Sequence, residues 1–202
     1  MIAKCVARGL ALSALLVVGP SLAFAQAHDM SAMAGGPIVL PPGSKITKAD
    51  VEFMQGMIAH HAQAVYMSRL SYGRPGLNPQ VLKLAKMIDQ SQIPEIIIMQ
   101  DWLRRNNQFV PDTSSWRHMQ MAGMLTDEQM KTLTDAQGLQ FDRKFLEYMI
   151  QHHNGALQMV NDLFASPGGG QDVDTGVFAT DVVLVQTAEI GLMLKLRKDE
   201  LP

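Results

Sequence analysis

The sequence is poor in the residue types on which many common functions depend. Cys5 is the only cysteine among 202 residues, and it lies in an N-terminal stretch that export would remove. No disulfide and no thiolate metal site can then form. Basic residues number 17 and acidic residues 19, so a surface that binds nucleic acid or anionic lipid has little support. Without a cysteine nucleophile or a clear serine, histidine and acid set, we expect no enzymatic activity.

The N-terminus is typical of a secretory signal peptide. Lys4 and Arg8 precede an apolar run over residues 10–18, and small residues follow at Ala23 and Ala25. This pattern predicts cleavage after Ala25 and removal of residues 1–25, although cleavage after Ala27 fits nearly as well. The apolar run is short for a membrane span. We therefore expect a periplasmic or secreted protein of net charge about −4 (15 basic against 19 acidic residues), with no membrane anchor after cleavage.

The remaining sequence predicts one all-α domain. Residues 26–46 hold glycine, proline and small residues without a sustained period, which indicates a flexible tail. Capping patterns at Thr47, Asn78 and Thr126 predict helix starts, and no segment alternates as a strand would. We expect a four-helix bundle over 47–200 made of repeat 1 (47–106), a connector with a short helix (107–138) and repeat 2 (139–200).

An internal duplication supports these boundaries. Seven residues of the segment 50–67 recur 92 positions later in 142–159: Asp50, Phe53, Met57, His60, His61, Ala64 and Met67 become Asp142, Phe145, Met149, His152, His153, Ala156 and Met159. A second pattern recurs after 94 positions, from Gln92, Glu95, Ile96 and Met99 to Gln186, Glu189, Ile190 and Met193. Each hairpin alone could not bury its apolar face, so two copies are expected to pack together.

The duplicated histidine pairs are the main candidate site. On a helix, residues three and four apart share a face, so each imidazole points toward apolar neighbours. One interpretation is structural, with each pair hydrogen-bonded to Glu95 or Glu189 of the facing helix. The other is metal binding, because a histidine that binds a metal usually donates its second N–H to a carboxylate. In that case Glu95, Glu189, Gln92 and Gln186 would surround the ligands.

Methionines flank both pairs and bear on the choice of metal. Met57, Met67, Met149 and Met159 could be core residues or thioether ligands. Sulfur together with imidazole favours Cu(I), with Cu(II) as a possible second state. Ligation requires neutral imidazole, so we expect affinity to fall below about pH 6.5.

Two further groups could bind metal. The connector holds His118, Met119, Met121 and Met124, which suit either a flexible copper-capturing loop or an apolar plug over one end of the bundle. In the tail, cleavage after Ala25 would place His28 third in the mature chain. A free amine, two amide nitrogens and this imidazole could hold Cu(II) in a square plane.

Other metal chemistries are less well supported by the residues. Di-iron bundles place a glutamate three residues before each histidine ligand, and here those positions hold Met57, Ile58, Met149 and Ile150. A redox bundle that holds haem or two metal ions remains an alternative, and the haem would not be attached covalently because no Cys-x-x-Cys-His is present. A structural or interaction module of the cell envelope is the third alternative.

The motif Phe-x3-Met-x2-His-His-x2-Ala-x2-Met, followed by Gln-x2-Glu-Ile-x2-Met, resembles the family called domain of unknown function 305. The resemblance covers both repeats, from about Thr47 to Leu196. It implies a ferritin-like four-helix bundle in an exported bacterial protein. The family includes the CopM-type periplasmic copper-binding proteins, so the resemblance also implies copper bound by histidine and methionine, a part in copper tolerance or transfer, and other copper-handling proteins as partners. The sequence does not predict an oligomeric state.

Overall fold

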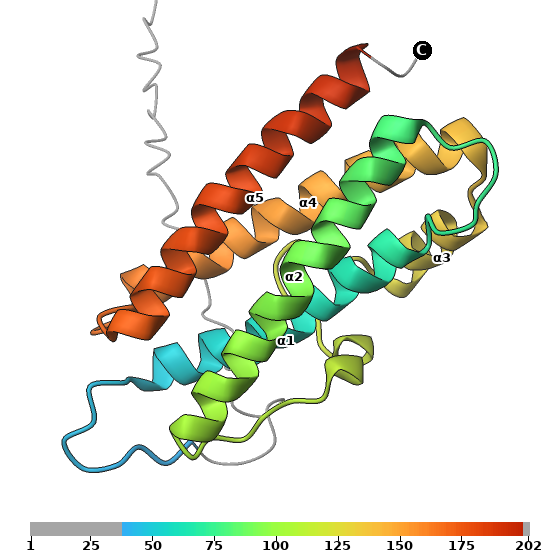
Figure 1. Ribbon diagram of the computed structural model, residues 1–202. Coiled ribbons are helices and arrows are strands. Elements are labelled where there is room, and N and C mark those ends of the chain that lie inside the picture. Colours follow the sequence, from blue (N-terminus) through green and yellow to red (C-terminus); the bar gives the residue numbers. More distant parts are fainter. Residues whose placement is uncertain (1–37, 200–202) are drawn as a thin grey trace, which may run out of the picture.

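The computed structural model describes residues 38–199. In chain order these residues form α1 (Lys48–Arg69), α2 (Pro79–Arg105), the short 3-10 helix η2 (Thr113–Arg117), α3 (Asp127–Asp135), α4 (Gly138–Ala165) and α5 (Val173–Asp199) (Figure 1). No strand occurs in this range. The prediction of an all-α protein is confirmed. The expected signal peptide and most of the expected tail lie outside the described residues.

The helices begin at the predicted caps. The Thr47 hydroxyl accepts a hydrogen bond from the backbone N–H of Asp50, whose carboxylate accepts one from the Thr47 N–H at 2.7 Å. These two bonds satisfy backbone donors that the first helical turn leaves unpaired. Asn78 caps α2, and Thr126 opens α3 with a second capping box. At the other end, α1 stops at Arg69, and the loop 70–78 leads to α2.

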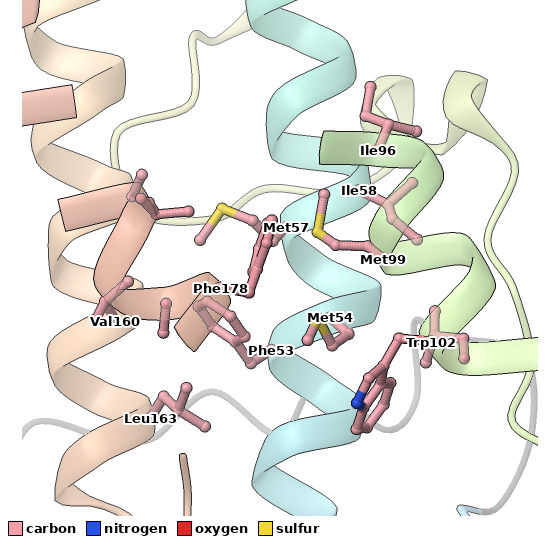
Figure 2. Close-up of a cluster of buried hydrophobic side chains, with 14 of the residues drawn as sticks. Phe53, Met54, Met57, Ile58, Ile96, Met99, Trp102, Val160, Leu163 and Phe178 are labelled. Atoms are coloured by element: carbon pink, nitrogen blue, oxygen red, sulfur yellow. The ribbon is translucent and has the colours of Figure 1, made fainter. Parts of the chain in front are cut away.

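The four long helices pack as two hairpins, α1 along α2 and α4 along α5, with α1 also against α4 and η2. Two clusters of buried apolar side chains lie along α1. The first contains Phe53, Met57 and Phe178, and Figure 2 shows Met57 on the side of α1 that faces α4 and α5. The second contains Met67 and Phe145. The histidine pair of α1 falls between these two clusters.

The duplication is visible in the contacts between the hairpins. The carboxylate of Asp50, at the start of α1, accepts a hydrogen bond of 2.7 Å from the backbone N–H of Gly170 in the loop after α4. Its counterpart Asp142 accepts one of 2.8 Å from the N–H of Asn78 in the loop after α1. Both donors and both acceptors differ by 92 positions (170 − 78 and 142 − 50). Each hairpin therefore holds the loop of the other in the same way.

The connector between the hairpins lies directly on α1 and α4. Gln63 of α1 donates to the carbonyl of Leu125 and accepts from its N–H. On α4, a Cβ at Gly155 would lie 2.0 Å from the carbonyl oxygen of Ala122 and 2.6 Å from the Cα of Gly123. Only glycine at position 155 permits this close backbone approach. The connector is therefore fixed against both α1 and α4.

α5 differs from the other helices in its apolar composition. By length and hydropathy, residues 173–198 are the one segment of the described chain that could cross a membrane. About 33% of the qualifying window is buried inside the protein, and Gln186, Glu189 and Met193 face the interior. Core helices of other proteins have the same composition.

Candidate metal centre

The two histidine pairs form one buried cluster where α1 packs against α4. His60 and His61 come from α1 and His152 and His153 from α4, and all four side chains are fully buried. The ring centroids of His60 and His152 lie 3.8 Å apart with a tilt of 40° between the planes. Those of His152 and His153 lie 6.3 Å apart. The 92-residue repeat thus brings equivalent histidines of the two hairpins into contact.

The second histidine of each pair is bonded to a carboxylate from the neighbouring helix of its own hairpin. Nε2 of His61 lies 2.7 Å from Oε2 of Glu95, and Nε2 of His153 lies 2.7 Å from Oε2 of Glu189. A neutral imidazole that donates its Nε2–H to a carboxylate carries its lone pair on Nδ1. Both carboxylates therefore orient a ring whose Nδ1 is a potential metal ligand.

The first histidine of each pair has a different environment. Nε2 of His60 lies 3.0 Å from the carbonyl oxygen of Ala122 in the connector, so this nitrogen carries the proton. Neither ring nitrogen of His152 makes a well-formed hydrogen bond with a described residue, and the backbone of His60 gives it only a weak polar contact. The connector approaches only one of the two equivalent histidines, which breaks the symmetry of the duplicated site.

Five ring nitrogens in this cluster are buried without a hydrogen-bond partner among the described residues. They are Nδ1 of His60, His61 and His153, and both Nδ1 and Nε2 of His152. A buried polar atom that lacks a partner costs about 1–3 kcal/mol. An apolar core would have no reason to keep five of them. Imidazole nitrogen is a donor that copper and zinc accept, so these atoms are candidate metal ligands.

Burial keeps the first histidines uncharged. Desolvation, together with a smaller effect of the neighbouring His61, lowers the pKa of His60 from 6.5 to about 3, while the bond to Ala122 acts in the opposite direction. Desolvation also lowers the pKa of His152 well below its usual value, with an added contribution from His60. Both rings are therefore neutral at physiological pH, which is the state that binds metal.

The flanking methionines lie on two sides of the histidine cluster. Met57 belongs to the first apolar cluster, against which Met159 packs. Met67 and Met149 belong to the second. Met57, Met67 and Met149 are fully buried, and Met159 is half-buried. Each side thus takes one methionine from each hairpin, as expected for two equivalent helices that run in opposite directions.

The remaining predicted residues are more dispersed. Gln92 and Gln186 are 2% exposed and keep unpaired side-chain atoms. In the connector, Met119 and Met124 are buried, Met121 is half-buried and His118 is exposed. Only the connector's backbone, through Ala122, is bonded to the histidine cluster. His28 lies outside the described residues.

The four histidines do not by themselves form a complete set of metal ligands. Among residues 38–199, no three side chains from histidine, cysteine, aspartate and glutamate converge as a metal-binding group. A metal ion held here would draw on methionine sulfur in addition to imidazole, or on a rotated ring. Ala122 is the one contributor that sequence reasoning missed, because a loop carbonyl has no residue-type signal.

The chain is similar to one described protein family and to several solved structures. The family model for domain of unknown function 305 matches residues 50–197. Among solved structures, a fragment of a protein of this family from Deinococcus radiodurans is 29% identical over 74% of this chain and 95% of its own, with a TM-score of 0.64. A second member from Streptomyces coelicolor is 32% identical over 73% of this chain and 91% of its own, with a TM-score of 0.61.

A third similar structure carries a metal. CopM in its Cu(I)-bound form is 26% identical over 74% of this chain and 96% of its own, with a TM-score of 0.60. CopM structures with Cu(II) and with silver are also similar to this chain. No curated protein sequence matches significantly.

Proposed function

The chain belongs to the family of domain of unknown function 305, and we propose that it is an exported copper-binding protein that uses its four buried histidines without catalysing a reaction. The observation that carries this proposal is the set of five unpaired ring nitrogens in a fully buried cluster. CopM, which has a similar fold, binds Cu(I), Cu(II) and silver. Copper tolerance or copper transfer to other periplasmic proteins is the role proposed for this binding.

His60, His61, His152 and His153 would supply imidazole nitrogen, while Glu95 and Glu189 hold the second histidine of each pair in one tautomer. Met57, Met67, Met149 and Met159 would add sulfur and favour Cu(I) over Cu(II). The proposal also includes the fold: a ferritin-like four-helix bundle in which the connector covers the metal site.

A purely structural role accounts for only part of the cluster. The bonds from His61 to Glu95 and from His153 to Glu189 would stabilise each hairpin whether or not metal binds. However, neither ring nitrogen of His152 makes a well-formed hydrogen bond with a described residue, so hydrogen bonding within the core does not account for its burial. Haem between the first histidines is disfavoured because the 3.8 Å between the ring centroids leaves no room for a porphyrin.

The direct test is an anaerobic Cu(I) titration in competition with a chromogenic chelator. We would compare the exported chain with a variant carrying His60→Ala, His61→Ala, His152→Ala and His153→Ala, after confirming by circular dichroism that the variant folds. The wild type is expected to remove copper from the chelator and the variant to lose this ability. His118→Ala, an exposed histidine outside the cluster, is the matched control.

If the wild type and the quadruple variant compete equally for copper, the metal is bound by the connector or the tail and not by the four histidines. No competition by either protein would leave the histidines as structural groups and end the copper proposal. A second variant is needed in case the quadruple variant does not fold. Glu95→Gln keeps the bulk of the side chain, and it should weaken the metal affinity without unfolding the protein.

A further inference from the structure

The outward face of α5 is apolar and is covered by no described residue. Val177, Leu184 and Leu194 are 57%, 64% and 50% exposed. A Cβ at Gly191 would meet nothing within 4 Å. In Figure 1, α5 lies at the edge of the molecule, with one side packed on α4 and the other side open. Contiguous exposed apolar surface of this kind usually marks an interaction site.

The duplicated hairpin provides an internal control for this face. By the 94-residue offset, three apolar residues of α5 correspond to polar residues of α2: Lys83, Gln90 and Gln100. Lys83 and Gln90 are exposed and Gln100 is half-buried, so the fold accepts polar side chains at these positions. Their replacement in α5 by Val177, Leu184 and Leu194 indicates a surface that is buried in the working state.

Charges divide this face into an acidic and a basic half. Asp181, Leu184, Ala188, Gly191 and Lys195 are all exposed and recur at alternating intervals of three and four residues. That spacing places them on one seam, like the contact positions of a coiled coil. The acidic end lies seven residues before Ala188 and the basic end seven residues after it. The two charged ends of the seam are therefore complementary when the helix is reversed about Ala188.

We propose that α5 binds the α5 helix of a second copy of this chain in an antiparallel, two-fold symmetric pair. In this register Asp181 lies opposite Lys195 of the second copy, and the symmetry makes the same pair twice. Leu184 lies opposite Leu192 of the second copy, an exposed residue that borders the seam beside Gly191. Ala188 and Gly191 at the crossing allow the two backbones to approach closely. Charges of opposite sign across the contact select this orientation over the parallel one.

The size of the face predicts a moderate affinity. The seam from Asp181 to Lys195 is about 21 Å long, at 1.5 Å per residue, and Val177 extends it by about one turn. One helix face of this size is at the low end of stable interfaces, so we expect a dissociation constant on the order of micromolar. The charges within the seam would be costly in a lipid interior, which favours a protein partner. Glu189 and Gln186 face away from it, toward the core, so the pairing leaves the histidine cluster unchanged.

A charge-swap series with sedimentation equilibrium tests this pairing. The full chain would be expressed with its own signal sequence and purified from the periplasm. Asp181→Lys and Lys195→Asp should each weaken dimerisation about tenfold or more, because two attractive pairs become repulsive. The double variant should restore it. The two positions are about 21 Å apart within one helix, so an ion pair within one chain cannot explain a rescue.

Two further variants separate this face from general surface effects. Leu184→Glu should abolish the dimer. Ile98→Glu changes an apolar residue of α2 that is 51% exposed, and it should leave the dimer intact. A wild type that stays monomeric, or a dimer that is indifferent to all three changes at Asp181, Leu184 and Lys195, would overturn the proposal. Binding of the monomer to vesicles of anionic lipid, lost with Leu184→Glu, would also overturn it and assign the face to a membrane surface.

Discussion

Acid should destabilise the metal-free protein through its buried histidines before the carboxylates are protonated. His60 has a pKa of about 3 in the folded chain and 6.5 as the reference value. Between these two values the unfolded chain binds a proton that the folded chain does not, so stability rises with pH. The contribution of neutral His60 is therefore fully present above about pH 6.5 and is lost as the pH falls toward 3.

The magnitude follows from proton linkage. Each pH unit within this window changes the free energy of unfolding by about 1.4 kcal/mol per group, so His60 alone costs about 2 kcal/mol between pH 7 and pH 5. His152 acts in the same direction, because its pKa is also lowered. With a urea dependence of about 2 kcal/mol per molar, the unfolding midpoint should fall by roughly 1 M or more.

Urea unfolding at pH 7 and pH 5, followed by circular dichroism on metal-free protein, measures this loss. In His60→Gln the loss should be smaller by about 2 kcal/mol, since glutamine does not titrate. His118→Gln removes an exposed histidine and should leave the loss as it is in the wild type. The reasoning is wrong if His60→Gln and wild type lose the same stability over this range.

Three further substitutions test other contacts. Gly155→Ala would place a methyl group 2.0 Å from the Ala122 carbonyl oxygen, and it should destabilise the fold by about 1–3 kcal/mol in urea unfolding; an unchanged midpoint would mean that the connector moves freely. Thr47→Ala removes half of a capping box, and thermal unfolding should show a loss of about 1 kcal/mol. Glu189→Gln weakens the carboxylate bond to its histidine and should lower Cu(I) affinity about 10- to 100-fold in the chelator competition, whereas unchanged affinity would place the metal elsewhere.

The pairing of the two hairpins could be predicted because it is written in the sequence twice. A constant offset of 92 positions makes the two hairpins equivalent and predicts that they pack together, but it left open whether their histidine pairs form one cluster or two. Glu95 and Glu189 were predictable as partners for the same reason, since they recur with the facing helix. These inferences depend only on residue types and spacing.

The choice between neighbours within each pair could not be predicted. Adjacent helical residues differ by about 100° around the axis, so either His60 or His61 could have faced Glu95. The rotation of α1 is set by tertiary packing of its whole apolar surface, which assigns His61 to Glu95 and leaves His60 to the connector. The approach of Ala122 also requires Gly155 on α4, a coincidence of two distant segments without a spacing rule.

Paired methionine substitutions would decide whether sulfur belongs to the metal site. Met57 and Met159 lie on one side of the histidines and Met67 and Met149 on the other, so the two sides can be tested separately. Replacing either pair by leucine nearly conserves volume and should cost less than about 1.5 kcal/mol per site. If the thioethers of one pair bind the metal, the variant that lacks this pair should have a lower Cu(I) affinity. Its Cu(II) affinity should change little, because sulfur prefers the softer ion. Met54→Leu, a buried methionine on another stripe of α1, is the matched control. Unchanged Cu(I) affinity in both paired variants would restrict the ligands to imidazole.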